Sequence, residues 1–142
     1  MKTEIKIKQI IMVLVTLLIM TACGDAEKNK LENRAADYWK FKIEKNFKKA
    51  YQFLTPGWRK TDSEAAFSQR LITSKVKWLD SKVTKKECSQ PDLCIVTMEI
   101  TYEYQFRTSG SQKIKADSMV KETWILKDNT WYHLPLQKKM SQ

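Results

Sequence analysis

The sequence is poor in glycine, proline and histidine: its 142 residues include three Gly, three Pro and one His. The glycines lie far apart, so the chain has no Gly-rich phosphate loop and no G-x-G-x-x-G dinucleotide motif. The G-x-S-x-G and H-E-x-x-H motifs of hydrolases and zinc proteases are also missing. With His133 as the single histidine, a Ser-His-Asp triad and a His-rich metal site are nearly excluded. We therefore expect no metal and no cofactor.

Basic residues outnumber acidic ones and give a net charge of +10. The lysines are spread from end to end, which favours a solvated basic surface over a patch that binds nucleic acid or anionic lipid. Tyr102, Tyr104 and Phe106 have the composition of a base-stacking platform. They share one face of a predicted strand with Val96 and Ile100, so a packed core is the favoured interpretation, and we expect no nucleic-acid partner.

Residues 1–22 have the pattern of an export signal. Lys2, Lys6 and Lys8 give a basic start, and Ile10–Met20 is an apolar run of 11 residues. That run is too short for a stable membrane span and has the length of a signal-peptide core. The alternatives are a transmembrane anchor or an ordinary secretory signal with a chance cysteine.

The run ends in Met20-Thr21-Ala22-Cys23-Gly24, which resembles the lipobox of bacterial lipoproteins. Met20 departs from the usual leucine of that motif. The resemblance implies cleavage before Cys23 and a lipid anchor of acyl chains such as palmitate on its thiol. Residues 23–29 would then be the lipidated cysteine and a tether. Asp25 lies one place too late to copy the inner-membrane retention signal of enteric lipoproteins, which favours the outer membrane facing the periplasm.

Lipidation of Cys23 leaves the other two cysteines as a pair. Cys88 and Cys94 are separated by five residues that include Pro91-Asp92, which is typical of a turn. An exported chain lies in an oxidising compartment, so we predict a Cys88–Cys94 disulfide across a hairpin. A zinc site needs more ligands than two cysteines and one distant histidine.

Residues 30–136 are expected to form one α+β domain, followed by a tail at 137–142. Helical periodicity predicts helices over 31–45, 47–54 and 63–73, with Thr55-Pro56-Gly57 ending the second. The alternation of apolar and polar residues over Cys94–Arg107 predicts a long strand with one buried face. Further strands are predicted over 76–86, with a bulge, and over 112–127 and 131–134, with turns at 108–111 and 128–129.

Several short stretches together resemble the nuclear transport factor 2-like superfamily. They are Ala35–Trp39, Asn46–Pro56, Glu122-Thr123-Trp124 and Asp128–Tyr132. Over residues 30–136 the resemblance implies a cone, in which N-terminal helices pack on a curved four-stranded antiparallel sheet. A cystatin-like fold, with one helix on a sheet, is the alternative. The superfamily includes isomerases, dehydratases, transport adaptors and binding domains, so the fold alone implies no function.

The turns predict which residues lie opposite one another. A two-residue turn at 128–129 puts Trp124 opposite His133, with Glu122 diagonal to His133. A hairpin centred on Gly110 puts Tyr102 opposite Ser118, and also residue 98 opposite residue 122. The disulfide, without a bulge, puts residue 80 opposite residue 102.

Asp80, Tyr102, Glu122 and His133 are therefore expected to point into an apolar concavity. The resemblance implies that isomerases and dehydratases of the superfamily use a Tyr with Asp or His in such a place, where burial shifts the pKa for proton transfer. A structural polar network, or a bulge that turns Asp80 and Glu122 to solvent, is the alternative.

A binding or accessory module is favoured over an enzyme. We expect a lipid-anchored protein of the bacterial cell envelope, whose concavity takes an apolar small molecule or a partner protein of the envelope. A small isomerase or dehydratase that uses the four polar residues is the alternative, and docking of the lysines on anionic lipid is a third hypothesis.

Overall fold

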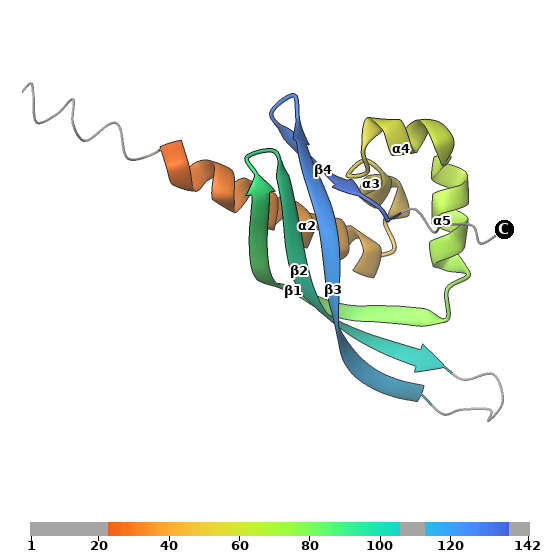
Figure 1. Cartoon of the computed structure of the whole chain (residues 1–142). Coiled ribbons are helices and arrows are strands. Elements are labelled where there is room, and N and C mark those ends of the chain that lie inside the picture. Colours follow the sequence, from red (N-terminus) through yellow and green to blue (C-terminus); the bar gives the residue numbers. More distant parts are fainter. Residues whose placement is uncertain (1–22, 106–112, 137–142) are drawn as a thin grey trace, which may run out of the picture. The chain divides into compact units, whose positions relative to one another are not determined.

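The structure is a computed structural model of the chain (Figure 1). It describes the backbone of residues 23–105 and 113–136, and the side chains from residue 30 onward within these ranges. The predicted leader, the side chain of Cys23, the turn at 108–111 and the tail at 137–142 lie outside the described residues. The chain divides into two compact units, Met1–Lys30 and Leu31–Gln142. Apart from the first part of the first helix, the features described below belong to the second unit.

In the described residues, four helices precede the sheet: α2 (Cys23–Ile43), α3 (Phe47–Tyr51), α4 (Pro56–Thr61) and α5 (Glu64–Ile72). They confirm the three predicted helical segments with two differences. The backbone of α2 is already helical at Cys23, where the sequence predicts a tether, and α4 is an additional helix. None of these helices has the length and apolar character that crossing a membrane requires.

Helix α4 begins within Thr55-Pro56-Gly57, which the sequence predicts only as the end of the second helix. The side chain of Thr55 accepts the backbone N–H of Trp58 at 3.2 Å, and Pro56 occupies the first helical turn. A threonine cap followed by proline is a standard helix start. The stretch thus ends one helical segment and starts the next.

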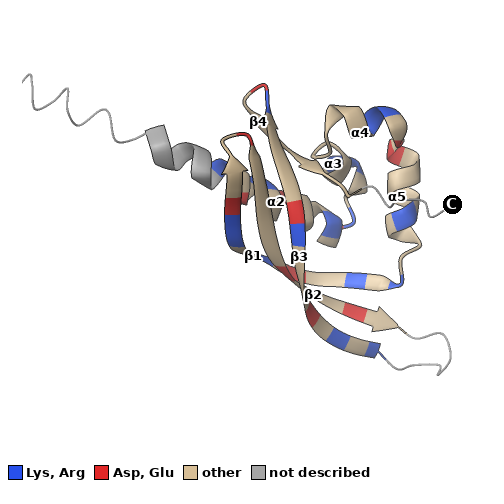
Figure 2. Cartoon of the chain, in the orientation of Figure 1, with Lys and Arg blue, Asp and Glu red and all other residues tan. Residues whose placement is uncertain are grey.

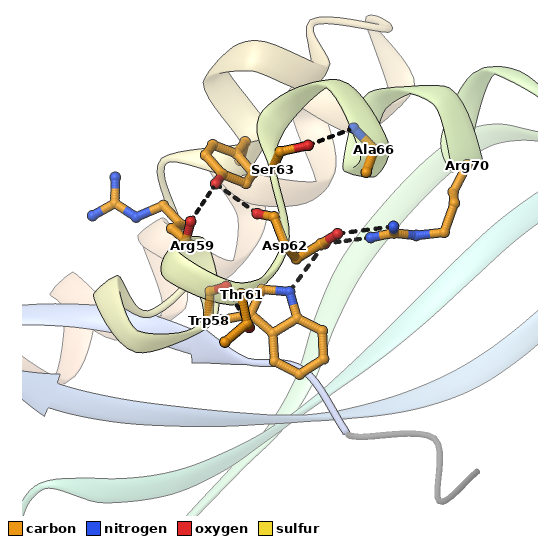
Figure 3. Close-up of polar contacts among 8 residues, drawn as sticks. Trp58, Arg59, Thr61, Asp62, Ser63, Ala66 and Arg70 are labelled. Carbon is orange, nitrogen blue, oxygen red and sulfur yellow. Dashed lines mark hydrogen bonds and ion pairs between the residues drawn. The ribbon is translucent and has the colours of Figure 1, made fainter.

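A polar network at the α4–α5 corner fixes the direction of α5 (Figure 3). The carboxylate of Asp62 accepts the indole N–H of Trp58 at 3.2 Å and forms an ion pair with Arg70. The Tyr51 hydroxyl donates to the backbone carbonyls of Arg59 and Asp62, at 3.0 and 2.7 Å. Hydrogen bonding from Arg70 holds the pKa of Asp62 below its usual range. The corner therefore ties α3, α4 and α5 together.

Four strands form an antiparallel meander in the order β1-β2-β3-β4 (Figure 1). They are β1 (Val76–Gln90), β2 (Leu93–Gln105), β3 (Lys113–Lys127) and β4 (Thr130–Leu134). The helices pack on one face of this sheet, so the predicted α+β class is confirmed. The main core joins the buried face of β2 to the helices; its members are Leu31, Ala35, Tyr38, Trp39, Phe47, Ala50, Tyr51, Leu54, Phe67, Cys94, Val96, Met98, Ile100, Trp124 and Trp131.

The turn at residues 128–129 is confirmed, and the register that it predicts is correct. Asp128 and Asn129 both have positive φ, 49° and 59°, as a type I′ turn requires. Trp124 lies opposite His133. Between β2 and β3 the predicted register is wrong by two residues, because Tyr102 lies opposite Ala116 instead of Ser118. A shift by two keeps every side chain on its predicted face.

Strand β1 contains the predicted irregularity, with register shifts at three places. The first shift puts Trp78 opposite Tyr102 and Asp80 opposite Thr101, so the predicted Asp80–Tyr102 pair is wrong. Asp80 is exposed, as the bulge alternative predicts, but Glu122, which that alternative also turns to solvent, is buried. At the other end of the strand pair, Cys88 and Cys94 form the predicted disulfide.

Breaking the disulfide should destabilise the domain. A closed loop of about seven residues is worth about 2.4 kcal/mol when its closure entropy is removed from the unfolded state. In urea unfolding of the purified protein, we expect reductant to lower the free energy of unfolding by about 2 kcal/mol. The double substitution Cys88→Ala/Cys94→Ala is the control, since reductant should leave its unfolding curve unchanged. An equal effect of reductant on both proteins would contradict the prediction.

Candidate functional site

Three ionisable side chains lie inside the core. Lys42 of α2, Glu122 of β3 and His133 of β4 are 8%, 5% and 9% exposed. The sequence predicts Glu122 and His133 here but misses Lys42. The helical spacing of Ala35, Tyr38 and Lys42 is the signal that could have found it, because residues three or four apart share one face of a helix.

The indole of Trp39 lies between these charged groups. Its Nε1 donates to Glu122 Oε1 at 2.9 Å, and the same carboxylate oxygen lies 3.9 Å from His133 Nε2. Lys42 Nζ lies 3.3 Å from the centroid of the Trp39 ring and 4.8 Å from that of Trp78. These distances are within the range of cation–π attraction. Trp39 thus contacts both the acid and the base of the cluster.

Burial shifts the protonation of all three groups towards the neutral form. It raises the pKa of Glu122, against the opposing effects of the Lys42 charge and the Trp39 hydrogen bond. It lowers the pKa of Lys42, against the opposing effect of Glu122. It also lowers the pKa of His133 to about 3, helped by the Lys42 charge. His133 is therefore a neutral imidazole at physiological pH.

The cluster is not fully satisfied by hydrogen bonds. Among the described residues, Glu122 Oε2 and His133 Nδ1 are buried without a partner. The Trp124 indole also lowers the pKa of Glu122, although its Nε1 does not reach hydrogen-bond geometry. Buried polar atoms without partners are uncommon in native folds and occur at strained or functional places.

The four predicted site residues do not converge. Glu122 and His133 lie together in the core, whereas Asp80 is exposed at the bulge of β1. Glu122 lies opposite Val96, and Tyr102 is six residues further along β2. That separation is about 20 Å along a strand. The structure therefore brings together two of the four residues.

Tyr102 instead lines a concavity of about 460 Å³. We call this space the apolar concavity; its walls are Trp39, Val76, Trp78, Ile100, Tyr102, Tyr104, Ile114, Ala116, Ser118 and Val120. Ser118 is the single non-aromatic polar side chain among them. The sequence predicts a packed core for Tyr102 and Tyr104, but both are only half-buried. Phe106, the third aromatic of that group, lies outside the described residues.

A second, smaller space of about 240 Å³ lies between α2, α5 and the start of β1. We call it the lysine cleft; it is lined by Lys42, Ile43, Lys45, Phe47, Leu71, Ile72, Ser74, Lys75, Val76, Lys77 and Trp78. Elsewhere, basic residues are distributed over helices and strands alike (Figure 2). In the part of the chain that the structure describes, no group of acidic, histidine and cysteine side chains could hold a metal ion.

Comparisons with known proteins bear on the fold only. No family model matches the chain, and no curated protein matches it. A SEC-C motif-containing protein from Rhodopseudomonas palustris superposes with a TM-score of 0.50 at 10% identity, over 68% of this chain and 69% of that chain. A nuclear transport factor 2-like protein of unknown function from Prochlorococcus marinus gives a TM-score of 0.34 at 14% identity, over 50% and 56% of the two chains.

The buried histidine should make stability depend on pH. The pKa of His133 is about 3 in the folded state, below its ordinary value of 6.5. Its contribution to stability is therefore present above pH 6.5 and lost as the pH falls towards 3. Glu122 has a raised pKa and acts in the opposite direction, with a contribution that is lost as the pH rises above its ordinary value of 4.5. Replacing His133 thus removes one of two opposing effects.

We expect His133→Gln to change the slope of unfolding free energy against pH by up to about 1.4 kcal/mol per pH unit between pH 4.5 and 6. Urea unfolding at several pH values measures this slope. The exposed substitution Lys127→Gln is the control and should keep the slope of the original protein. Equal slopes for His133→Gln and the original protein would show that His133 is not held neutral by the fold.

Proposed function

We propose that this protein is a lipid-anchored cell-envelope protein whose α+β domain binds an apolar small molecule. The apolar concavity is the observation that carries the proposal. Its volume of about 460 Å³ falls within the range of about 300–1,000 Å³ that is typical of small-molecule sites. Its walls come from three strands and one helix, so they are held by the sheet register and not by loops.

The composition of the concavity supports binding by burial of apolar surface. The walls include four aromatic side chains, Trp39, Trp78, Tyr102 and Tyr104, and Ser118 offers a hydroxyl that can orient a ligand. Aromatic side chains bury large areas and lose little conformational entropy when they do so. An apolar surface left open to water is unfavourable, and a ligand that covers it would stabilise the domain.

Export and lipidation rest on the sequence of the leader and on the cysteines. The basic start, the short apolar run and Cys23 agree with one another. The Cys88–Cys94 disulfide supports the proposal, because disulfides persist in oxidising compartments. An anchored domain next to a bilayer is close to a supply of apolar molecules.

The isomerase or dehydratase alternative has less support. It requires Glu122 or His133 to touch a substrate, but both are buried in the core. Trp39 separates the carboxylate of Glu122 from the apolar concavity, since it hydrogen-bonds to Glu122 and also forms part of the wall. A partner protein of the envelope is the other candidate occupant of the concavity.

Filling the concavity should weaken ligand binding. We expect a dodecanol derivative bearing a photoreactive diazirine to label residues of the concavity, as mapped by peptide mass spectrometry. The substitution Ala116→Trp places a large side chain in this space and should reduce labelling at least fivefold. The matched control is Met119→Trp, because Met119 is 58% exposed and does not line the concavity. Equal labelling of both variants would refute the site.

The anchor has a direct test by intact mass. Protein extracted from native membranes should have the mass of the chain cleaved before Cys23 plus acyl chains, and reductant should add two protons as the disulfide opens. The substitution Cys23→Ser should yield protein without acyl chains. An uncleaved chain with three free thiols would overturn both the export and the anchor.

A further inference from the structure

The apolar concavity and the lysine cleft adjoin each other. Val76 and Trp78 of β1 belong to the walls of both. Trp78 also packs edge-on against Trp39, with ring centroids 6.1 Å apart. The two spaces therefore share a wall that is formed by side chains of one strand.

The lysine cleft is positively charged and contains no acidic side chain among its described walls. Lys45 and Lys75 are exposed there, and neither forms a hydrogen bond or ion pair with a described side chain. Lys77 is a weaker contributor, because it lies opposite Glu103 in the β1–β2 ladder. The cleft thus offers cations that have no anionic partner of their own.

The backbone of Lys45, a lining residue of the cleft, is held by hydrogen bonds at the end of α2. Its φ is +58°, and the N–H groups of Lys45 and Asn46 return to the carbonyls of Lys42 and Phe41, at 3.1 and 2.8 Å. This hydrogen-bond pattern is a Schellman motif, which ends a helix with one left-handed residue. Glycine is the usual residue there, so a lysine at this place has a conformational cost.

Lys42 adds a buried cation to the lysine cleft. Its side chain lines the cleft, yet the residue is only 8% exposed. The ammonium lies over the rings of Trp39, Trp78 and Tyr38 and is attracted by Glu122, but it makes no hydrogen bond or ion pair with any described side chain. A buried cation without a hydrogen-bonded partner is unfavourable. An anion in the cleft would supply that partner.

We propose that the two spaces form one site for a fatty acid. The acyl chain lies in the apolar concavity, and the carboxylate lies in the lysine cleft near Lys42, Lys45 and Lys75. The volume of about 460 Å³ lies near the small end of the range for ligand sites, which suits one acyl chain better than the two of a phospholipid. This inference rests on the proposed function, because it names the class of the apolar ligand.

The experiment compares an acid with its uncharged counterpart. The full chain is reconstituted in nanodiscs of phosphatidylcholine alone, so that no anionic lipid competes. Diazirine-bearing dodecanoate labels the protein, and unlabelled dodecanoate or dodecanol is added as competitor. We expect dodecanoate to halve the labelling of the concavity at a concentration at least tenfold lower than dodecanol does, because the charged headgroup adds charge-assisted hydrogen bonds.

Two double variants locate the headgroup. Lys45→Gln/Lys75→Gln removes two cations of the cleft, and the preference for acid over alcohol should fall at least fivefold. Lys60→Gln/Lys127→Gln removes two exposed cations elsewhere and should keep the preference. Both competitors partition into the same discs in every sample, so the change in preference between variants is independent of partitioning.

The outcomes separate this inference from the proposed function. If dodecanol competes as well as dodecanoate, or if the cleft variant keeps the preference for the acid, the fatty-acid inference is wrong while the apolar site stands. If neither the acid probe nor the alcohol probe labels the concavity, the proposed function itself is wrong.

Discussion

Trp39 donates its indole N–H to the buried carboxylate of Glu122 and offers its ring face to the ammonium of Lys42. Charges inside a core are unfavourable unless each is paired and hydrogen-bonded. The indole satisfies part of both requirements, because its edge is a donor and its face attracts a cation. The same ring forms part of the wall of the apolar concavity. The position of Trp39 therefore links the stability of the core to the shape of the candidate site.

The buried cluster of Lys42, Glu122 and His133 constrains the fold, whether or not it takes part in a reaction. Trp39 of α2 donates a hydrogen bond to Glu122 of β3 and also contacts Lys42, so the cluster ties the helix to the sheet. His133 packs against Tyr38, with ring centroids 5.0 Å apart, and joins β4 to the same helix. A structural role explains the cluster without a reaction.

The sequence predicts the structural features that depend on residues close together in the chain. The alternation over β2, the turn at 128–129 and the Trp124–His133 pairing follow from local periodicity and turn chemistry, and the structure confirms them. The exact bulge in β1, which turns Asp80 to solvent, depends on how one strand fits another. The β2–β3 register depends on the length of a connecting turn, which periodicity alone does not fix. The burial of Lys42 is a tertiary effect, because a lysine is ordinarily assigned to the surface.

The apolar concavity arises because the strands of the sheet extend further than the helices that pack on them. In the half of β2 that faces the helices, Val96, Met98 and Ile100 are buried. In the second half, Tyr102 and Tyr104 continue the same apolar face but are only half-buried, where β2 and β3 extend beyond the helices (Figure 1). Sequence periodicity cannot distinguish these halves, because both alternate in the same way. The apolar pattern that predicts a core thus also creates an open surface wherever the helices end before the strands, and at that surface a ligand can take the place of a helix.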